Sequence, residues 1–185
     1  TYFLVDMKSP GVDVRPLREI TGDARFNEVF LDDVFVPDSC VVGEVNDGWR
    51  LARTTLANER VAMGSSLGEA LERVLESPAA AENAERLGEL VAQGLAVAAL
   101  DLRASLRVLS GQEPGAESSV RKLVGVRQRQ DVAEFAVELL GPDAAVDGEL
   151  VHEFLLTRCL SIAGGTTQVL MNLAGERILG LPREP

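Results

Sequence analysis

The stretch NDGWRLARTTLANERVAMGSSLGEALERVLE, residues 46–76, is the segment from which the fold of this chain can be worked out. Asn46 or Asp47 can cap a helix, because a short side-chain oxygen accepts hydrogen bonds from the free N–H groups of a first turn. Apolar residues then recur at steps of three and four, with one gap, which predicts one long helix from Asn46 to Glu76. The apolar positions are Trp49, Ala52, Leu56, Met63, Leu67, Ala70 and Val74.

Glu59 fills the gap in this apolar stripe, three residues after Leu56 and four before Met63, and Arg60 follows on its edge. A buried carboxylate is costly unless it is paired or used. Burial also raises a carboxyl pKa toward values suited to proton transfer near neutral pH. Two interpretations remain open: Glu59 belongs to an ion pair or reaches water at a helix rim, or it is a general base.

The rest of the chain after Asp47 also favours helices. Two of the expected helices have 31 residues and a third has about 22, which correspond to roughly 47 and 33 Å at 1.5 Å per residue, and they are joined by short loops. Such helices predict an antiparallel four-helix-type bundle over residues 46–185. The later helices are expected at 80–110, from Ser118 or Ser119 to Leu139, at 149–160 and at 166–179. The apolar faces are Leu87, Val91, Leu95, Ala98, Leu102, Ser105 and Leu109, and then Val120, Val124, Val132, Phe135 and Leu139.

Residues 1–45 predict a small antiparallel β piece, so the fold class is mainly α with a β remnant in front of the bundle. Strands are expected at 2–7, 12–20 and 26–36, and Pro16 marks an edge because it has no N–H to donate. A bend or bulge is expected at Asp32 and Asp33. Turn chemistry explains these acids and Asp38 better than a metal site does. Because no initiator methionine precedes the first strand, we expect a piece of a longer protein.

Composition excludes several classes of protein. The 185 residues carry 29 acidic and 18 basic side chains, a net charge of −11, which argues against a nucleic-acid binder and a polybasic membrane anchor. No apolar run approaches the roughly 20 residues that span a bilayer. The two cysteines, Cys40 and Cys159, have no metal-like or redox spacing and fit reduced thiols in a cytoplasmic protein.

A second feature is the sequence IAGGTTQ, residues 162–168. Two glycines let a backbone approach a ligand closely, and the N–H groups and dipole of the following helix favour an anionic or electron-rich group. A plain turn between two helices, with Thr166 as N-cap, explains the same residues. Both interpretations remain open on local grounds.

In this order, these segments resemble the C-terminal half of the acyl-CoA dehydrogenase family, over nearly the whole chain. The actinobacterial-type members that end in Gly-Leu-Pro-Arg look most similar. The segments on which this resemblance rests are FNEVFLDDV (26–34), VP (36–37), VGE (42–44), GW (48–49), LANERVAM (56–63), IAGGTTQ (162–168) and ERILGLPR (176–183).

The resemblance implies an N-terminal helical domain, a central β domain and a C-terminal four-helix bundle, of which this chain holds only the end of the β domain (1–45) and the bundle (46–185). It implies an FAD flavoprotein of fatty acid or lipid metabolism that passes electrons to an electron-transfer acceptor protein. It also implies dimers or tetramers, with FAD bound partly across a subunit interface. In this family a carboxylate removes the α-proton of an acyl-CoA and the β-hydride passes to flavin N5.

Position by position, the resemblance assigns roles to individual residues. In many members the catalytic Glu immediately precedes the Gly-Thr of the last motif, where this chain has Gly164. Isovaleryl- and long-chain-type members place it on the first bundle helix just before an Arg, which gives Glu59 as the base. Arg60 then orients the base or substrate, and Leu56 lines the acyl-CoA channel. The implied FAD contacts are Gly165, Thr166, Gln168 and Gly141.

Three departures from the family pattern bear on FAD binding. The Arg-containing segment that reaches a neighbouring subunit's FAD is not recognisable near residues 77–83. The Gln and Gly-Gly pattern after the third helix appears as Glu138 and Gly141-Pro142, and Met171 replaces an Arg. These departures fit either a catalytic member with altered FAD binding or a non-catalytic structural subunit paired with a homologous partner subunit.

Overall fold

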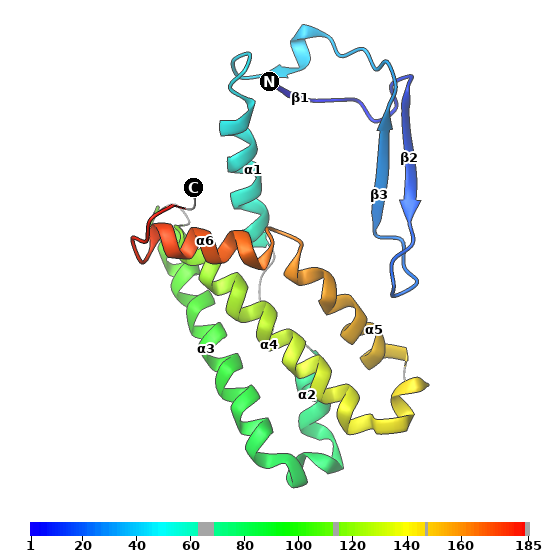
Figure 1. Ribbon diagram of the computed structural model, residues 1–185, viewed down its shortest axis with the longest axis vertical. Coiled ribbons are helices and arrows are strands. Elements are labelled where there is room, and N and C mark those ends of the chain that lie inside the picture. The colour runs from blue at the N-terminus through cyan, green and yellow to red at the C-terminus, as the bar shows by residue number, and fades with distance from the viewer. Residues whose placement is uncertain (63–68, 113–114, 147, 184–185) are drawn as a thin grey trace. The chain divides into compact units, whose positions relative to one another are not determined.

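The computed structural model describes residues 1–62, 69–112, 115–146 and 148–183 (Figure 1). The chain divides into two compact units, Thr1–Glu59 and Arg60–Pro185. The division lies inside a helix, whereas the sequence places a boundary between residues 45 and 46, and that boundary stays a prediction.

The first unit contains two small antiparallel sheets. Strand β2 (Val12–Leu17) pairs with β3 (Phe26–Leu31), with Val12 opposite Leu31 and Leu17 opposite Phe26. Strand β1 (Tyr2–Phe3) pairs with β4 (Val41–Val42), which follows a 3₁₀ turn at Asp38–Cys40. The predicted antiparallel β piece is confirmed, although its strands are shorter than expected and β4 was not foreseen.

The predicted bend at Asp32 and Asp33 is confirmed and ends β3. Asp33 has φ 49°, in the left-handed region, where Asp is tolerated better than most residues. The Asp32 N–H donates to the Gly11 carbonyl at 2.9 Å, which closes the sheet at this end. The turn at 32–33 therefore shapes the backbone, as its sequence indicated.

Helix α1 (Gly48–Ala62) begins directly after Asp47, one of the two expected caps. Arg50 Nε donates to Asp47 Oδ2 at 2.6 Å, and Asn46 takes a left-handed φ of 71° at the entry to the helix. Helix α2 (Glu69–Glu76) covers the end of the expected long helix. Its continuity through 63–68 lies outside the described residues.

The second unit is a helical bundle, which confirms the predicted fold class. Its other helices are α3 (Ala84–Leu109), α4 (Glu117–Leu140), α5 (Gly148–Thr157) and α6 (Thr167–Arg177). Short 3₁₀ segments at Pro78–Asn83, Gly141–Ala145 and Arg158–Ser161 connect them. Helix α4 packs against α2, α3, α5 and α6 and is the centre of the unit (Figure 1).

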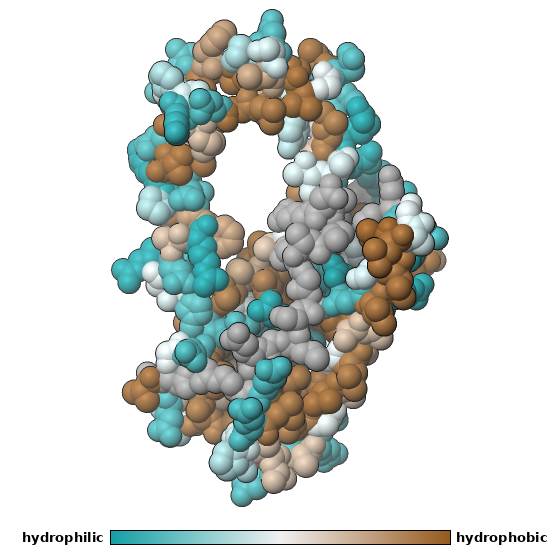
Figure 2. Space-filling view, turned by 180° about the vertical axis from the view of Figure 1, so that it is seen from behind, coloured by the Kyte–Doolittle hydropathy of each residue, from teal (hydrophilic) through white to brown (hydrophobic). Residues whose placement is uncertain are grey.

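Helix α3 buries a different face from the predicted one. Leu87 is buried as expected, but Leu95, Leu102 and Leu109 are exposed by 61%, 62% and 82%. Two apolar stripes on α3 satisfy the same helical spacing, and the one that contains Gly94 is the one that is buried. Figure 2 shows hydrophobic patches at the surface beside hydrophilic ones. The buried residues of α3 are Leu87, Leu90, Gly94 and Val97.

Helix α4 buries an apolar half and a polar half. Val132 and Phe135 are 2% and 1% exposed, as predicted, and form the core with residues of α2, α3 and α5. Val124, predicted on the same face, is 38% exposed. Toward the N-terminus the buried positions are instead Ser119, Lys122, Gly125 and Gln128. Among the described residues, no helix is both long enough and apolar enough to cross a bilayer.

Candidate functional site

The turn that precedes α6 is built from two glycines in left-handed conformations. Gly164 has φ 66° and Gly165 has φ 105°, values that side chains rarely allow. Thr166 follows in an extended conformation (φ −63°, ψ 155°), and its Oγ1 accepts a hydrogen bond from the Val169 N–H at 3.3 Å. Thr166 is thus the N-cap of α6, as the interpretation of these residues as a turn between two helices predicted.

Free hydrogen-bond donors gather at the start of α6. The Leu170 N–H is used by the Thr166 carbonyl and the Val169 N–H by the cap. Among the described residues no acceptor bonds the N–H groups of Thr167 and Gln168. Together with the helix dipole, these groups suit a phosphate oxygen or the polar edge of a flavin. The donor set therefore fits FAD, in agreement with the contacts that the resemblance implies.

Lys122 on α4 holds this turn by a hydrogen bond to its backbone. Its side chain is 7% exposed, and its Nζ donates to the Gly165 carbonyl at 2.7 Å. The bond joins residues 43 positions apart in the sequence. Lys122 was not identified from the sequence. A pattern in the sequence could have indicated it: Lys122 lies three residues after Ser119 and three before Gly125, so that it shares one helix face with small and polar residues.

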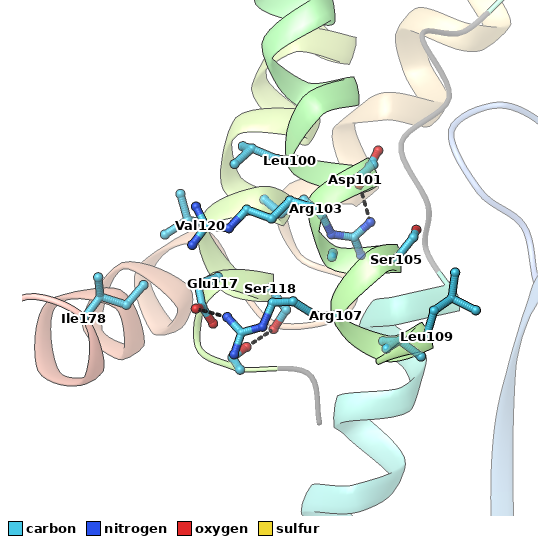
Figure 3. A pocket seen from close by; sticks show the side chains of 14 residues that line it. Leu100, Asp101, Arg103, Ser105, Arg107, Leu109, Glu117, Ser118, Val120 and Ile178 are labelled. Atoms are coloured by element: carbon cyan, nitrogen blue, oxygen red, sulfur yellow. Dashed lines mark hydrogen bonds and ion pairs between the residues drawn. The ribbon is translucent and has the colours of Figure 1, made fainter. Parts of the chain in front are cut away.

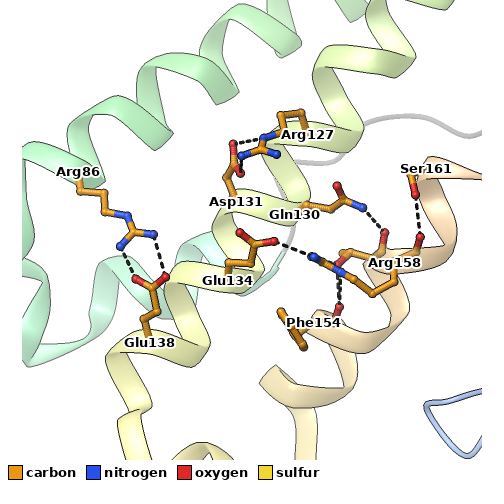
Figure 4. A network of polar contacts seen from close by, with 10 residues as sticks. Arg86, Arg127, Gln130, Asp131, Glu134, Glu138, Phe154, Arg158 and Ser161 are labelled. Atoms are coloured by element: carbon orange, nitrogen blue, oxygen red, sulfur yellow. Dashed lines mark hydrogen bonds and ion pairs between the residues drawn. The ribbon is translucent and has the colours of Figure 1, made fainter. Parts of the chain in front are cut away.

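A polar network anchors the chain just before the glycine turn (Figure 4). Arg158 donates from Nη1 to Glu134 Oε1 at 2.7 Å, from Nη2 to Thr157 Oγ1 at 3.0 Å and from Nε to the Phe154 carbonyl at 3.1 Å. Gln130 Nε2 donates to the Thr157 carbonyl at 2.9 Å. The segment that leads into the turn is therefore fixed to α4.

The predicted cofactor residue Gly141 lies away from the glycine turn. It is the C-cap of α4, with φ 54°, whereas Lys122 is near the other end of that helix. The 19 positions between them correspond to about 28 Å of helix at 1.5 Å per residue. Within one chain the structure therefore brings Gly165, Thr166 and Gln168 together but does not bring Gly141 to them.

Glu138, one turn before Gly141, forms an ion pair with Arg86 of α3 (Figure 4). The hydrogen bond from Arg86 is the main cause that lowers the pKa of Glu138, and the same bond raises the pKa of Arg86. The Arg86 guanidinium also stacks on the Phe135 ring at 4.6 Å. Glu138 is thus engaged in an exposed ion pair between α3 and α4, at the position where the family pattern has a Gln.

The predicted base and its neighbour lie on α1. The backbone of Glu59 and Arg60 is helical, but their side chains lie outside what the structure describes. Leu56 is 40% exposed and Trp49 is 73% exposed. The roles of Leu56, Glu59 and Arg60 stay predictions.

A cavity of about 660 Å³ lies between the end of α3, the start of α4 and Ile178 (Figure 3). Its volume is typical of ligand pockets. Two ion pairs, Arg107 with Glu117 and Arg121 with Asp101, are formed between residues that line it. A hydrogen bond from its own backbone N–H and one from Arg107 lower the pKa of Glu117. The apolar lining includes Leu100, Val108, Leu109 and Val120. No sequence motif indicated this cavity.

Comparison with known proteins identifies similar chains. A family model described as "Acyl-CoA dehydrogenase, C-terminal domain" matches residues 46–179. Acyl-CoA dehydrogenase FadE34 of Mycobacterium tuberculosis is 58% identical over 189 residues, which are 99% of this chain and 27% of that protein. Acyl-CoA dehydrogenase IpdE1 of the same organism is 36% identical over 201 residues, 100% of this chain and 51% of that protein.

Among solved structures, the steroid ACAD Tcur3481-Tcur3483 is similar with a TM-score of 0.85 at 24% identity. The match covers 98% of this chain and 52% of that one, and it shows a common fold. The chain spans about half the length of IpdE1 and of the solved structure, and about a quarter of FadE34.

Proposed function

This chain belongs to the acyl-CoA dehydrogenase family, and we propose that it supplies the C-terminal part of an FAD-dependent enzyme that desaturates an acyl-CoA thioester. The observation that carries the proposal is the turn at Gly164 and Gly165, with the free N–H groups of Thr167 and Gln168 behind it. Gly165, Thr166 and Gln168 would hold the flavin. When bound, FAD supplies the oxidant that takes up the β-hydride of the substrate.

Glu59 is the proposed base. Its carboxylate would accept the α-proton of the thioester, and the neighbouring Arg60 would orient the carboxylate or the substrate. Gly164 supports this assignment because it has no side chain at the position where many relatives carry their Glu. Its φ of 66° also disfavours most other residues there. The acid must then come from another element, and Glu59 interrupts an apolar stripe on α1.

The test is Glu59→Gln in the full-length protein, with Glu72→Gln on α2 as a matched control. Glu59→Gln should bind FAD and unfold at the same urea concentration as the unaltered protein. Anaerobic bleaching of the flavin by acyl-CoA should slow by about 10²–10⁴-fold, the range that general base catalysis contributes. Bleaching at an unaltered rate would remove Glu59 as the base, and a full-length protein that binds no FAD would refute the proposed function.

We assign Gly141 to the FAD site of a second subunit. The separation along α4 supports this, because one flavin held at the glycine turn of a chain is remote from the C-cap of its own α4. The second subunit is either another copy of this chain or a homologous partner. The exposed apolar stripe of α3, at Leu95, Leu102, Leu106 and Leu109, offers a surface for such association.

A second candidate function is that of a structural subunit without catalysis. The ion pair between Glu138 and Arg86 favours the structural subunit, because Glu138 stands at a position where the family pattern has a contact to the nucleotide. The two functions differ in what the purified protein binds. The structural subunit acquires FAD only after it is mixed with a partner chain, whereas a yellow, active homo-oligomer excludes this alternative.

A further inference from the structure

We propose that Lys122 is a positioning residue for the flavin site, because it fixes the peptide that presents the first donors of α6. This inference rests on the proposed FAD site. It concerns a residue that neither the sequence motifs nor the predicted contacts include. Lys122 itself acts through the Gly165 carbonyl and touches no part of the substrate.

The burial of Lys122 is the first argument. Lysine is rarely buried, because removing an ammonium group from water is costly unless hydrogen bonds compensate. Lys122 is nevertheless only 7% exposed, on the inner face of α4. Its Nζ to Gly165 oxygen distance of 2.7 Å is that of a charge-assisted hydrogen bond, which is stronger than a neutral one. A residue kept buried at this cost is expected to hold its partner firmly.

The geometry of the peptide gives the second argument. Because a trans peptide is planar, its C=O and N–H groups point in opposite directions. Lys122 draws the Gly165 carbonyl toward α4, so the Thr166 N–H of the same peptide points away from α4. No acceptor among the described residues bonds that N–H. It joins the free N–H groups of Thr167 and Gln168 as a set of donors.

The freedom of the glycines explains why such a tether is needed. Gly164 and Gly165 at φ 66° and 105° can adopt many other conformations, so sequence alone does not hold the turn in one shape. On the side of Ser161, the chain is tied to α4 by the Arg158 network, and on the other side α6 begins. Lys122 supplies a contact from α4 to the backbone between these two points.

The experiment compares Lys122→Met and Lys122→Gln with Ser119→Ala, which alters a buried polar residue on the same face of α4 without touching the turn. In full-length apoprotein, amide hydrogen exchange at residues 164–168 should accelerate in Lys122→Met, while exchange at the end of α6 stays unchanged. Titration should show a roughly tenfold rise in the FAD dissociation constant and an altered visible circular dichroism of the bound flavin. Lys122→Gln, which keeps a donor, should restore part of the affinity, and Ser119→Ala should match the unaltered protein.

Each outcome supports or overturns the positioning role of Lys122. Unchanged exchange at 164–168 together with unchanged FAD affinity in Lys122→Met would overturn the positioning role and leave the proposed function intact. If Lys122→Met does not fold, Lys122→Gln decides by the same two measurements. If the unaltered protein binds no FAD, the proposed function and this inference both fail. If exchange accelerates throughout α6 with FAD affinity unchanged, Lys122 is only a structural residue.

Discussion

The guanidinium of Arg158 lies 2.7 Å from the carboxylate of Glu134, 24 residues away, and so ties the segment before the glycine turn to α4 (Figure 4). The same guanidinium also donates to Thr157 and to the Phe154 carbonyl. One side chain thus serves three acceptors at the point where α5 ends. The shape of the candidate flavin site depends on this point as well as on Lys122.

The first prediction concerns Arg158→Met, which removes all three hydrogen bonds while keeping a long apolar side chain. We expect the free energy of unfolding to fall by about 1–2 kcal/mol, because partly buried charged hydrogen bonds are lost. Urea denaturation measures this. Arg127→Met is the matched control, because the Arg127 side chain, which pairs with Asp131, is far more exposed than that of Arg158. This substitution should change the free energy of unfolding by less than about 0.5 kcal/mol. Equal effects of the two variants would contradict the prediction.

The second prediction concerns pH and Glu138. Arg86 lowers the pKa of Glu138, so the ion pair stabilises the fold above the unfolded-state pKa of about 4.3. That stability is lost as the pH falls through the lower folded-state pKa. Glu138→Gln should therefore reduce the free energy of unfolding at neutral pH, by less than about 1 kcal/mol because both partners are exposed. The difference from the unaltered protein should vanish once the pH has fallen below the lowered folded-state pKa of Glu138.

A double-mutant cycle controls this experiment. In an Arg86→Met background the substitution Glu138→Gln should have little effect at any pH, because the partner is gone. An effect of Glu138→Gln that is independent of pH, or that persists without Arg86, would contradict the assignment of the lowered pKa to this ion pair.

The third prediction concerns Gln128, which is 2% exposed and whose amide nitrogen has no hydrogen-bond partner among the described residues. An unsatisfied buried donor costs free energy, and replacing it by an apolar group of similar shape removes that cost. Gln128→Leu should raise the free energy of unfolding by about 1 kcal/mol, as measured in urea. Destabilisation by Gln128→Leu would show that the amide is satisfied in the full-length protein.

The fourth prediction concerns the exposed stripe of α3. Leu102→Glu combined with Leu106→Glu should lower the particle mass measured by light scattering, because charges on an apolar interface prevent association. Leu179→Glu makes the same change at a residue that is also exposed but lies beyond α6, and should leave the mass unchanged. An unaltered mass in the α3 variant would exclude this stripe as the subunit contact.

Local sequence patterns predicted the elements of this fold well. The helix starting after Asp47, the cap at Thr166 and the bend at Asp33 depend on neighbours within a few residues, and all three are confirmed. The inward face of α3 could not be predicted in the same way. Two apolar stripes on that helix satisfy the same spacing rule, and the choice depends on how α3 packs against α4.

The mainly helical class, the glycine turn and the resemblance to the acyl-CoA dehydrogenase family could be read from the chain, because they depend on the order and spacing of its residues. The bond from Lys122 to Gly165, the ion pair of Arg86 with Glu138 and the distance of Gly141 from the turn became known from the folded structure. Such relationships join segments that are far apart in the sequence. Their partners are selected by how the helices pack around α4, which no local spacing specifies.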